Sequence, residues 1–99
     1  MTETIADKLT KLAELQRSRE KTYGFAYQKK GHVMQALFDE PVNLGTENSY
    51  NRFGILNLIV SKIIRYAENF DDGGHRDSLD DISVYAQILA ELDEEENRD

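Results

Sequence analysis

Two aspartates stand four residues apart in the last third of the chain, Asp77 and Asp81. In a helix this spacing places both carboxylates on one face, about one turn from each other. A pair of carboxylates can hold Mg²⁺ together with water and a substrate phosphate. Acids at the start of a helix can also complement its dipole without any ligand. The spacing therefore leaves two interpretations open, a magnesium site and a helix N-terminus.

Asp81 is also placed close to apolar side chains. On a helical wheel it lies at the edge of an apolar stripe, beside Tyr85. An unpaired carboxylate there would cost stability, so it needs a cation. Arg52 falls inside the apolar sector of the preceding predicted helix, where its guanidinium must be paired with an acid such as Asp81 or with an anionic ligand. Lys62 lies at the edge of that sector, where its long side chain could reach the solvent. Arg65 lies beyond the edge and is expected to be exposed.

Residues 17–30 interleave five basic side chains with Tyr23, Phe25 and Tyr27, and contain one acid. Such a segment suits the neutralisation of phosphate combined with stacking of a base on an aromatic ring. It could equally be a solvated connector whose aromatic side chains cover the core. If it binds a ligand, the acidic protein around it favours a small phosphorylated molecule over a polynucleotide.

Several kinds of chemistry have no motif in the chain. It lacks a glycine-rich phosphate loop, a His-Glu-x-x-His pair and a glycine-flanked serine. His32 and His75 are too far apart to share a metal by spacing, and His75 is expected to be a solvated turn residue. The absence of cysteine excludes disulfides and thiolate sites, and it suits a reducing compartment. No leader or membrane-spanning pattern is evident, so we expect a soluble, cytoplasmic protein.

The charge of the chain is unevenly distributed. Its 99 residues carry 12 basic and 19 acidic side chains, for a net charge of −7. Residues 1–65 have a net charge of +3, whereas residues 66–99 have −10 and residues 91–99 alone have −5. The acidity belongs mainly to the C-terminal end, and it does not argue against an anionic ligand on the rest of the protein.

Helical periodicity predicts four helices, over about residues 2–15, 31–38, 49–70 and 77–92. Thr4 with Asp7 is expected to cap the first, and Ser78 with Asp81 the fourth. Residues 71–75 form a predicted turn, and no segment alternates with the period of a strand. The sequence thus predicts a small all-α, four-helix bundle-like domain over residues 1–92, followed by an acidic tail at 93–99.

Each predicted helix has an apolar stripe that should form the core. The stripes are Ile5, Leu9, Leu12 and Leu15; Val33, Met34, Leu37 and Phe38; Phe53, Leu56, Val60, Ile63, Ala67 and Phe70; and Leu79, Ile82, Ala86, Leu89 and Leu92. Leu58 projects from the opposite side of the third helix. So short a chain has few elements with which to cover that helix, so we expect a homo-oligomer.

Three pieces of sequence together resemble the nucleotide modification associated domain 1 family of bacteriophages, which is similar to the MazG-like all-α nucleotide pyrophosphohydrolases. They are Lys21-Thr-Tyr-Gly, the helix with Arg52 and Lys62-Ile-Ile-Arg65, and Asp77-Ser-Leu-Asp-Asp81-Ile-Ser-Val-Tyr85-Ala86. The resemblance implies nucleotide handling. It implies that Asp77 and Asp81 are the carboxylates that bind the metal, and Mg²⁺ is the only cofactor it suggests. It also implies that phosphate is contacted by four basic residues, Lys21, Arg52, Lys62 and Arg65.

The chain departs from the MazG-like pattern in one respect. Those enzymes pair a Glu-Glu-x-x-Glu helix with a second acidic helix, and this sequence supplies the second only. We therefore expect a protein that binds a nucleotide or a nucleotide-derived signalling molecule of the host and sequesters it, a counter-defence role. Tyr23 or Tyr27 would stack on the base, and Asp81 would orient a cation or a sugar hydroxyl. The alternatives are a Mg²⁺-dependent (d)NTP pyrophosphohydrolase, completed by a partner subunit, and a structural adaptor with an Arg52–Asp81 ion pair.

Overall fold

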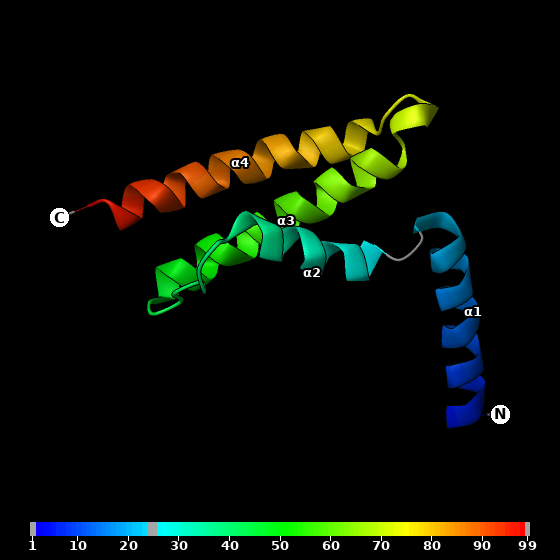
Figure 1. Ribbon diagram of the computed structural model, residues 1–99. Helices are drawn as coiled ribbons and strands as arrows, with labels where there is room; N and C mark the ends of the chain where they lie inside the picture. The colour runs from blue at the N-terminus through cyan, green and yellow to red at the C-terminus, as the bar shows by residue number, and fades with distance from the viewer. Residues whose placement is uncertain (1, 24–25, 99) are drawn as a thin grey trace.

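The computed structural model describes residues 2–23 and 26–98, and the side chains of these residues except those at 20–27. Its helices are α1 (Ile5–Tyr23), α2 (Ala26–Leu37), α3 (Glu47–Glu68), the short 3₁₀ helix η1 (Phe70–Asp72) and α4 (Arg76–Glu96). The described residues contain no strand, which confirms the all-α class. Figure 1 shows α3 and α4 as a long antiparallel hairpin, with α2 lying along the other side of α3.

The predicted cap of α1 is confirmed. The backbone N–H of Asp7 donates to Thr4 Oγ1 at 3.1 Å, and the backbone N–H of Thr4 donates to Asp7 Oδ2 at 3.2 Å. The helix continues to Tyr23 rather than ending near Leu15. Arginine, lysine and glutamate in this stretch are good helix formers, so the loss of apolar periodicity after Leu15 ends the stripe without ending the helix.

A reciprocal cap starts α3. Ser49 N–H donates to Thr46 Oγ1, and Thr46 N–H donates to Ser49 Oγ, both at 3.0 Å. The helix therefore begins at Glu47, ahead of the predicted start, and it ends at Glu68 because the chain turns into η1. Its length lets α3 lie along both α2 and α4, and it is the central helix of the fold.

The turn between α3 and α4 depends on two glycines. Gly73 and Gly74 have φ values of 94° and 89°, in the left-handed region that side chains with a Cβ rarely enter. A Cβ on Gly74 would also lie 3.0 Å from Cε2 of Tyr66. The predicted turn is thus confirmed, and the ring of Tyr66 closes it on one side.

The predicted cap of α4 is wrong. The helix begins at Arg76, and Ser78 is a completely buried residue within its first turn. The cap is His75, whose Nδ1 accepts from the backbone N–H of Ser78 at 3.2 Å, with Ser78 Oγ 2.6 Å from the same nitrogen. His75 is therefore not a solvated turn residue. An imidazole nitrogen can replace the usual side-chain oxygen as the acceptor, which the residue-type preference for a cap does not reveal.

At its other end α4 extends into the segment that was predicted to be a tail. The helix ends at Glu96, and the backbone N–H of Asn97 donates back to the carbonyl oxygens of Asp93 and Glu94. The acidic residues from Asp93 to Glu96 are thus helical. They are held by contacts with α3, which periodicity within α4 could not predict.

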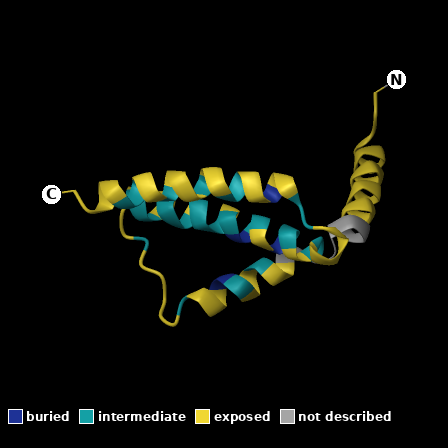
Figure 2. Cartoon of the chain, turned by 90° about the horizontal axis from the view of Figure 1, so that it is seen from above, coloured by how far each residue is buried: buried dark blue, intermediate teal, exposed yellow. Residues whose placement is uncertain are grey.

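The core is small. Met34, Val60 and Ile64 are its buried apolar residues in the described chain, and the side chains around them are only partly buried: Val33, Phe38, Phe53 and Leu56. Figure 2 shows the buried positions where α2 meets α3. The stripe predictions are wrong for the whole stripe of α1 and at several positions of the other helices, because these residues are exposed: Ile5, Leu9, Leu12, Leu15, Leu37, Ile63, Ala67, Phe70, Leu79 and Ala86. Each helix has neighbours on too few sides to cover a whole stripe. Leu58 is exposed, as expected.

The first helix stands apart from the other three. Figures 1 and 2 show α1 leading away from the α2–α3–α4 unit, and it makes no extended packing contact with another described helix. The radius of gyration is 17.7 Å, whereas a compact domain of this length has about 13 Å. Among the described residues, no helix is both long enough and apolar enough to cross a bilayer.

Candidate ligand-binding site

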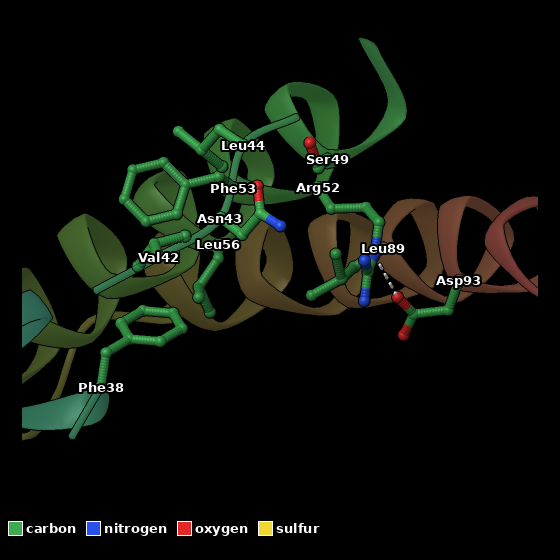
Figure 3. Close-up of a pocket in the computed structure, with 10 residues that line it drawn as sticks. All are labelled: Phe38, Val42, Asn43, Leu44, Ser49, Arg52, Phe53, Leu56, Leu89 and Asp93. Carbon is green, nitrogen blue, oxygen red and sulfur yellow. Dashed lines mark hydrogen bonds and ion pairs between the residues drawn. The ribbon is translucent and has the colours of Figure 1, made fainter. Parts of the chain in front are cut away.

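A pocket of about 230 Å³ is bounded by the loop after α2, the first turns of α3 and the last turns of α4. Figure 3 shows the ten side chains that line it. Apolar side chains form most of its wall, and the polar groups that face it are few: Asn43, Ser49, Arg52 and Asp93. Such a combination of an apolar wall with a few converging polar groups is typical of small-molecule sites. We call it the Arg52 pocket.

Two phenylalanines form the aromatic part of this wall. The ring centroids of Phe38 and Phe53 are 6.1 Å apart, and the ring planes are inclined by 47°. Phe38 follows the last residue of α2, and Phe53 comes from the second turn of α3. The packing of α2 on α3 therefore decides the shape of this side of the pocket. A flat apolar group of a ligand could lie against these rings.

The cationic group of the pocket is the guanidinium of Arg52. Its Nε donates to Oδ1 of Asp93 at 2.8 Å, and both side chains are partly exposed. Among the described residues, no protein group accepts from the two terminal nitrogens of Arg52. Arginine's planar fork can bind phosphate or carboxylate oxygens with two parallel hydrogen bonds. Asp93 thus orients Arg52 and leaves its terminal nitrogens for an anion.

Asn48 fastens the end of α4 beside this pocket. Its Nδ2 donates to the backbone oxygen of Leu92 at 3.2 Å and to Oε2 of Glu96 at 2.7 Å. Its Oδ1 is buried and has no hydrogen-bond partner in the described structure. These two bonds to the last turns of α4 fix the place of Asp93, and hence the orientation of Arg52.

Of the two partners expected for Arg52, an acid such as Asp81 or an anionic ligand, the pair with Asp81 is wrong. Asp81 pairs with Lys62 instead, with Nζ and Oδ2 2.9 Å apart. In the antiparallel hairpin, residues near the start of α3 lie opposite the end of α4, so Arg52 meets Asp93 and Lys62 meets Asp81. Helical periodicity placed Arg52 inside the apolar sector of its helix, but the register of the two helices decided which acid each cation meets.

Lys62 and Asp81 form a second polar group on another part of the hairpin. Asp77 and Tyr85 lie one turn of α4 before and after Asp81. Arg65 is partly buried, lies about one turn of α3 beyond Lys62, and has an interaction partner of its own. Arg52 and Lys62 are ten residues apart along α3, or about 15 Å. The chain therefore divides the predicted site residues between two places.

The acidic side chains do not form a metal centre by themselves. In the part of the chain that the structure describes, no three Asp, Glu or His side chains gather in a group that could hold a metal ion. Asp80, which also opens α4, binds Nε of Arg76 at 2.9 Å. Asp77 and Asp81 are thus a pair of acids on one helix face, and Lys62 already neutralises one of them.

The predicted basic-aromatic contacts fall largely outside the described side chains, since those of Lys21, Tyr23 and Tyr27 are not described. The same segment contributes Lys30, whose Nζ donates to Ser61 Oγ at 3.0 Å and joins α2 to α3. Sequence reasoning missed two other residues, because it assigned Phe38 to the core alone and Asp93 to the tail. The pairing of Arg52 with an acid near the end of α4 can be predicted only if the register of α3 against α4 is known.

Comparisons of this chain with protein families, with curated proteins and with solved structures found no match.

Proposed function

We propose that this protein binds a nucleotide or a nucleotide-derived signalling molecule in the Arg52 pocket and sequesters it. The observation that carries the proposal is the position of one oriented guanidinium beside an aromatic wall. Arg52 is held through Nε by Asp93, and Phe38 and Phe53 line the adjacent surface. A nucleotide has the two matching parts, a phosphate for the guanidinium and a flat base for the rings.

The other polar groups of the pocket fit the same ligand. Asn43 offers an amide that can donate to and accept from a base edge or a sugar hydroxyl, whereas the hydroxyl of Ser49 is engaged in the cap of α3. The volume of about 230 Å³ accommodates part of a nucleotide, with the remainder toward the open side. The sequence resemblance to a bacteriophage nucleotide family implies nucleotide handling, and the role proposed for the sequestration is counter-defence. The functional unit would be a homo-oligomer.

A second candidate is the Mg²⁺-dependent (d)NTP pyrophosphohydrolase. The observation that favours it is the alignment of Asp77 and Asp81 on successive turns of α4, with Lys62 2.9 Å from Asp81. Two carboxylates could hold part of the coordination shell of Mg²⁺, while Lys62 and Arg65 could face the phosphates. In this candidate a second copy supplies the remaining acids.

The two candidates use different residues, so matched substitutions separate them. Arg52→Met removes the guanidinium of the pocket. Arg76→Met is its control, because Arg76 also binds an aspartate through Nε at 2.9 Å but lies at the exposed start of α4. Asp81→Asn removes the charge of the acid that the hydrolase needs. Affinity would be measured by calorimetry with purified mononucleotides, nucleoside triphosphates and cyclic dinucleotides, each with Mg²⁺.

Sequestration predicts that one of these nucleotides binds and is recovered unchanged after the protein is denatured. Arg52→Met should then lower the affinity about ten- to hundredfold, as expected for the loss of a charged hydrogen-bonding group, with Arg76→Met and Asp81→Asn unaffected. Release of pyrophosphate that Asp81→Asn abolishes would establish the hydrolase instead. If no nucleotide binds or raises the melting temperature, both candidates fail and the adaptor function is favoured.

A further inference from the structure

The two ion pairs of the hairpin define two flanks of α3 and α4. Lys62 and Asp81 mark one flank, and Arg52 and Asp93 mark the other, which faces the loop after α2. With 100° of rotation per residue, the side chains at 63 and 67 of α3 lie within about 60° of Arg52. On α4, those at 79, 82 and 86 lie within about 40° of Asp93. All five therefore belong to the flank of the Arg52–Asp93 pair.

These five residues are apolar, and they lie opposite each other across the hairpin. They are Ile63, Ala67, Leu79, Ile82 and Ala86, which we call the hairpin patch. Since Lys62 meets Asp81, residues 63 and 67 of α3 lie close to residues 79 and 82 of α4. Ile63 is 50% exposed and Leu79 44% exposed. The patch thus combines stripes that were predicted to be core, and four of its residues are exposed while Ile82 is partly buried.

A second uncovered apolar surface follows α1. Its stripe, spaced by three and four residues, consists of Ile5, Leu9, Leu12 and Leu15. Leu9 and Leu12 are 60% and 59% exposed, as is expected for a helix that makes no extended packing contact with another described helix. An amphipathic helix with an apolar stripe is stable in water chiefly when that stripe is buried against a partner.

The solvent-accessible surface of the chain is larger than that of a compact monomer of the same mass. The chain exposes 8008 Å², whereas a compact monomer of 11.4 kDa is expected to expose about 5,800 Å². The excess of roughly 2,200 Å² per chain exceeds what one partner contributes to a standard protein–protein interface, about 800 Å². Two copies can therefore form a full interface from surface that a compact monomer would have buried.

Charge favours contact between α1 and the α3–α4 hairpin of another copy. α1 contains five basic and three acidic residues, for a net charge of +2, whereas α4 contains one basic and eight acidic residues, for −7. Two copies of α4 would repel each other, while α1 and α4 attract. The two apolar surfaces thus lie on helices of opposite net charge.

We infer that a second copy of this chain covers the hairpin patch, and that it does so with α1. Each copy lays the stripe of its α1 across the patch of the other, so the two contacts are equivalent and close a symmetric dimer. The exchange buries both uncovered surfaces at once. It stands independently of nucleotide binding, because neither the stripe nor the patch includes a residue of the Arg52 pocket.

The test uses pairs of neutral substitutions in the full chain. Leu9→Gln with Leu12→Gln disables the stripe, and Ile63→Gln with Leu79→Gln disables the patch. Leu58→Gln with Val84→Gln is the control, because these exposed apolar residues lie away from the patch, on other faces of α3 and α4. Molar mass would be measured by light scattering after gel filtration. Circular dichroism would verify that each variant keeps its helix content.

The wild-type chain and the control should be dimers, and the stripe and patch variants should each be monomers. A mixture of the stripe variant with the patch variant should form dimers again, because one intact stripe then meets one intact patch. A monomeric wild-type chain, a monomeric control, or a mixture that stays monomeric would each overturn the inference.

A crosslink distinguishes exchange from an α1 that folds back on its own hairpin. The chain has no cysteine, so Leu12→Cys and Ala86→Cys can be introduced together and joined by a short bismaleimide. Exchange predicts covalent dimers as the main product, with two links per dimer. Crosslinks formed only within single chains would overturn it, whatever the helix content of the other variants.

Discussion

The Nε of Arg52 donates to Oδ1 of Asp93 at 2.8 Å, which joins the second turn of α3 to the last turns of α4. Both side chains are partly exposed, at 38% and 49%. Solvent screens a pair of this kind, so its contribution to stability should be small even though it orients the cation of the pocket. The relationship is therefore expected to matter for binding more than for folding.

A double-mutant cycle of Arg52→Met and Asp93→Asn measures how much the ion pair contributes to the free energy of unfolding. We expect a coupling energy of at most about 1 kcal/mol in the free energy of unfolding, which is the usual range for exposed ion pairs. Urea denaturation of the four proteins gives the value. A coupling energy above about 2 kcal/mol would show that the pair is a structural element of the hairpin rather than a ligand contact.

Asn48 should contribute more to the end of α4 than its exposure suggests. Asn48→Ala removes the hydrogen bonds to Leu92 and Glu96, and we expect it to cost about 1–2 kcal/mol. Amide hydrogen exchange at residues 92–96 should accelerate, because those bonds hold the last turns on α3. The control is Asn57→Ala, since in the described part of the chain the side-chain amide of Asn57 donates to the carbonyl oxygen of Phe53 within its own helix. Equal exchange rates in both variants would contradict the assignment.

His75 should be needed as the cap of α4. His75→Ala removes the acceptor for the backbone N–H of Ser78, and a lost cap costs about 0.5–2 kcal/mol. His75→Asn should retain most of the stability, because an asparagine oxygen can accept the same hydrogen bond. Thermal unfolding checks both. His32→Ala, at an exposed position of α2, should change little, and a comparable loss in this variant would argue against a specific cap.

Alanine substitutions at glycines should have opposite effects in the helix and in the turn. Gly54 lies within α3 and a Cβ there meets nothing within 4 Å, so Gly54→Ala should stabilise the protein by up to about 1 kcal/mol. Gly74→Ala should destabilise it by more than about 1 kcal/mol, because the positive φ strains the backbone and the Cβ meets the Tyr66 ring. Gly73→Ala isolates the strain, since a Cβ there has open space. Calorimetric melting temperatures should decrease from Gly54→Ala through Gly73→Ala to Gly74→Ala.

Local sequence patterns were enough to predict the four helices, the glycine turn and the cap at Thr4, because these depend on residues within one or two turns of each other. It also marked Arg52 as a cation that needed a partner. It located the start of α4 only approximately, since a histidine nitrogen caps that helix in place of an oxygen.

Only the tertiary structure decided which acid each cation meets and which stripe is covered. The register of α3 against α4 places Arg52 at Asp93 and Lys62 at Asp81, and no local pattern encodes that register. Likewise, periodicity shows that Ile63 and Leu79 belong to apolar faces but not whether a neighbouring helix lies over them. Burial depends on the number and placement of neighbours, and in this chain three packed helices leave both residues exposed.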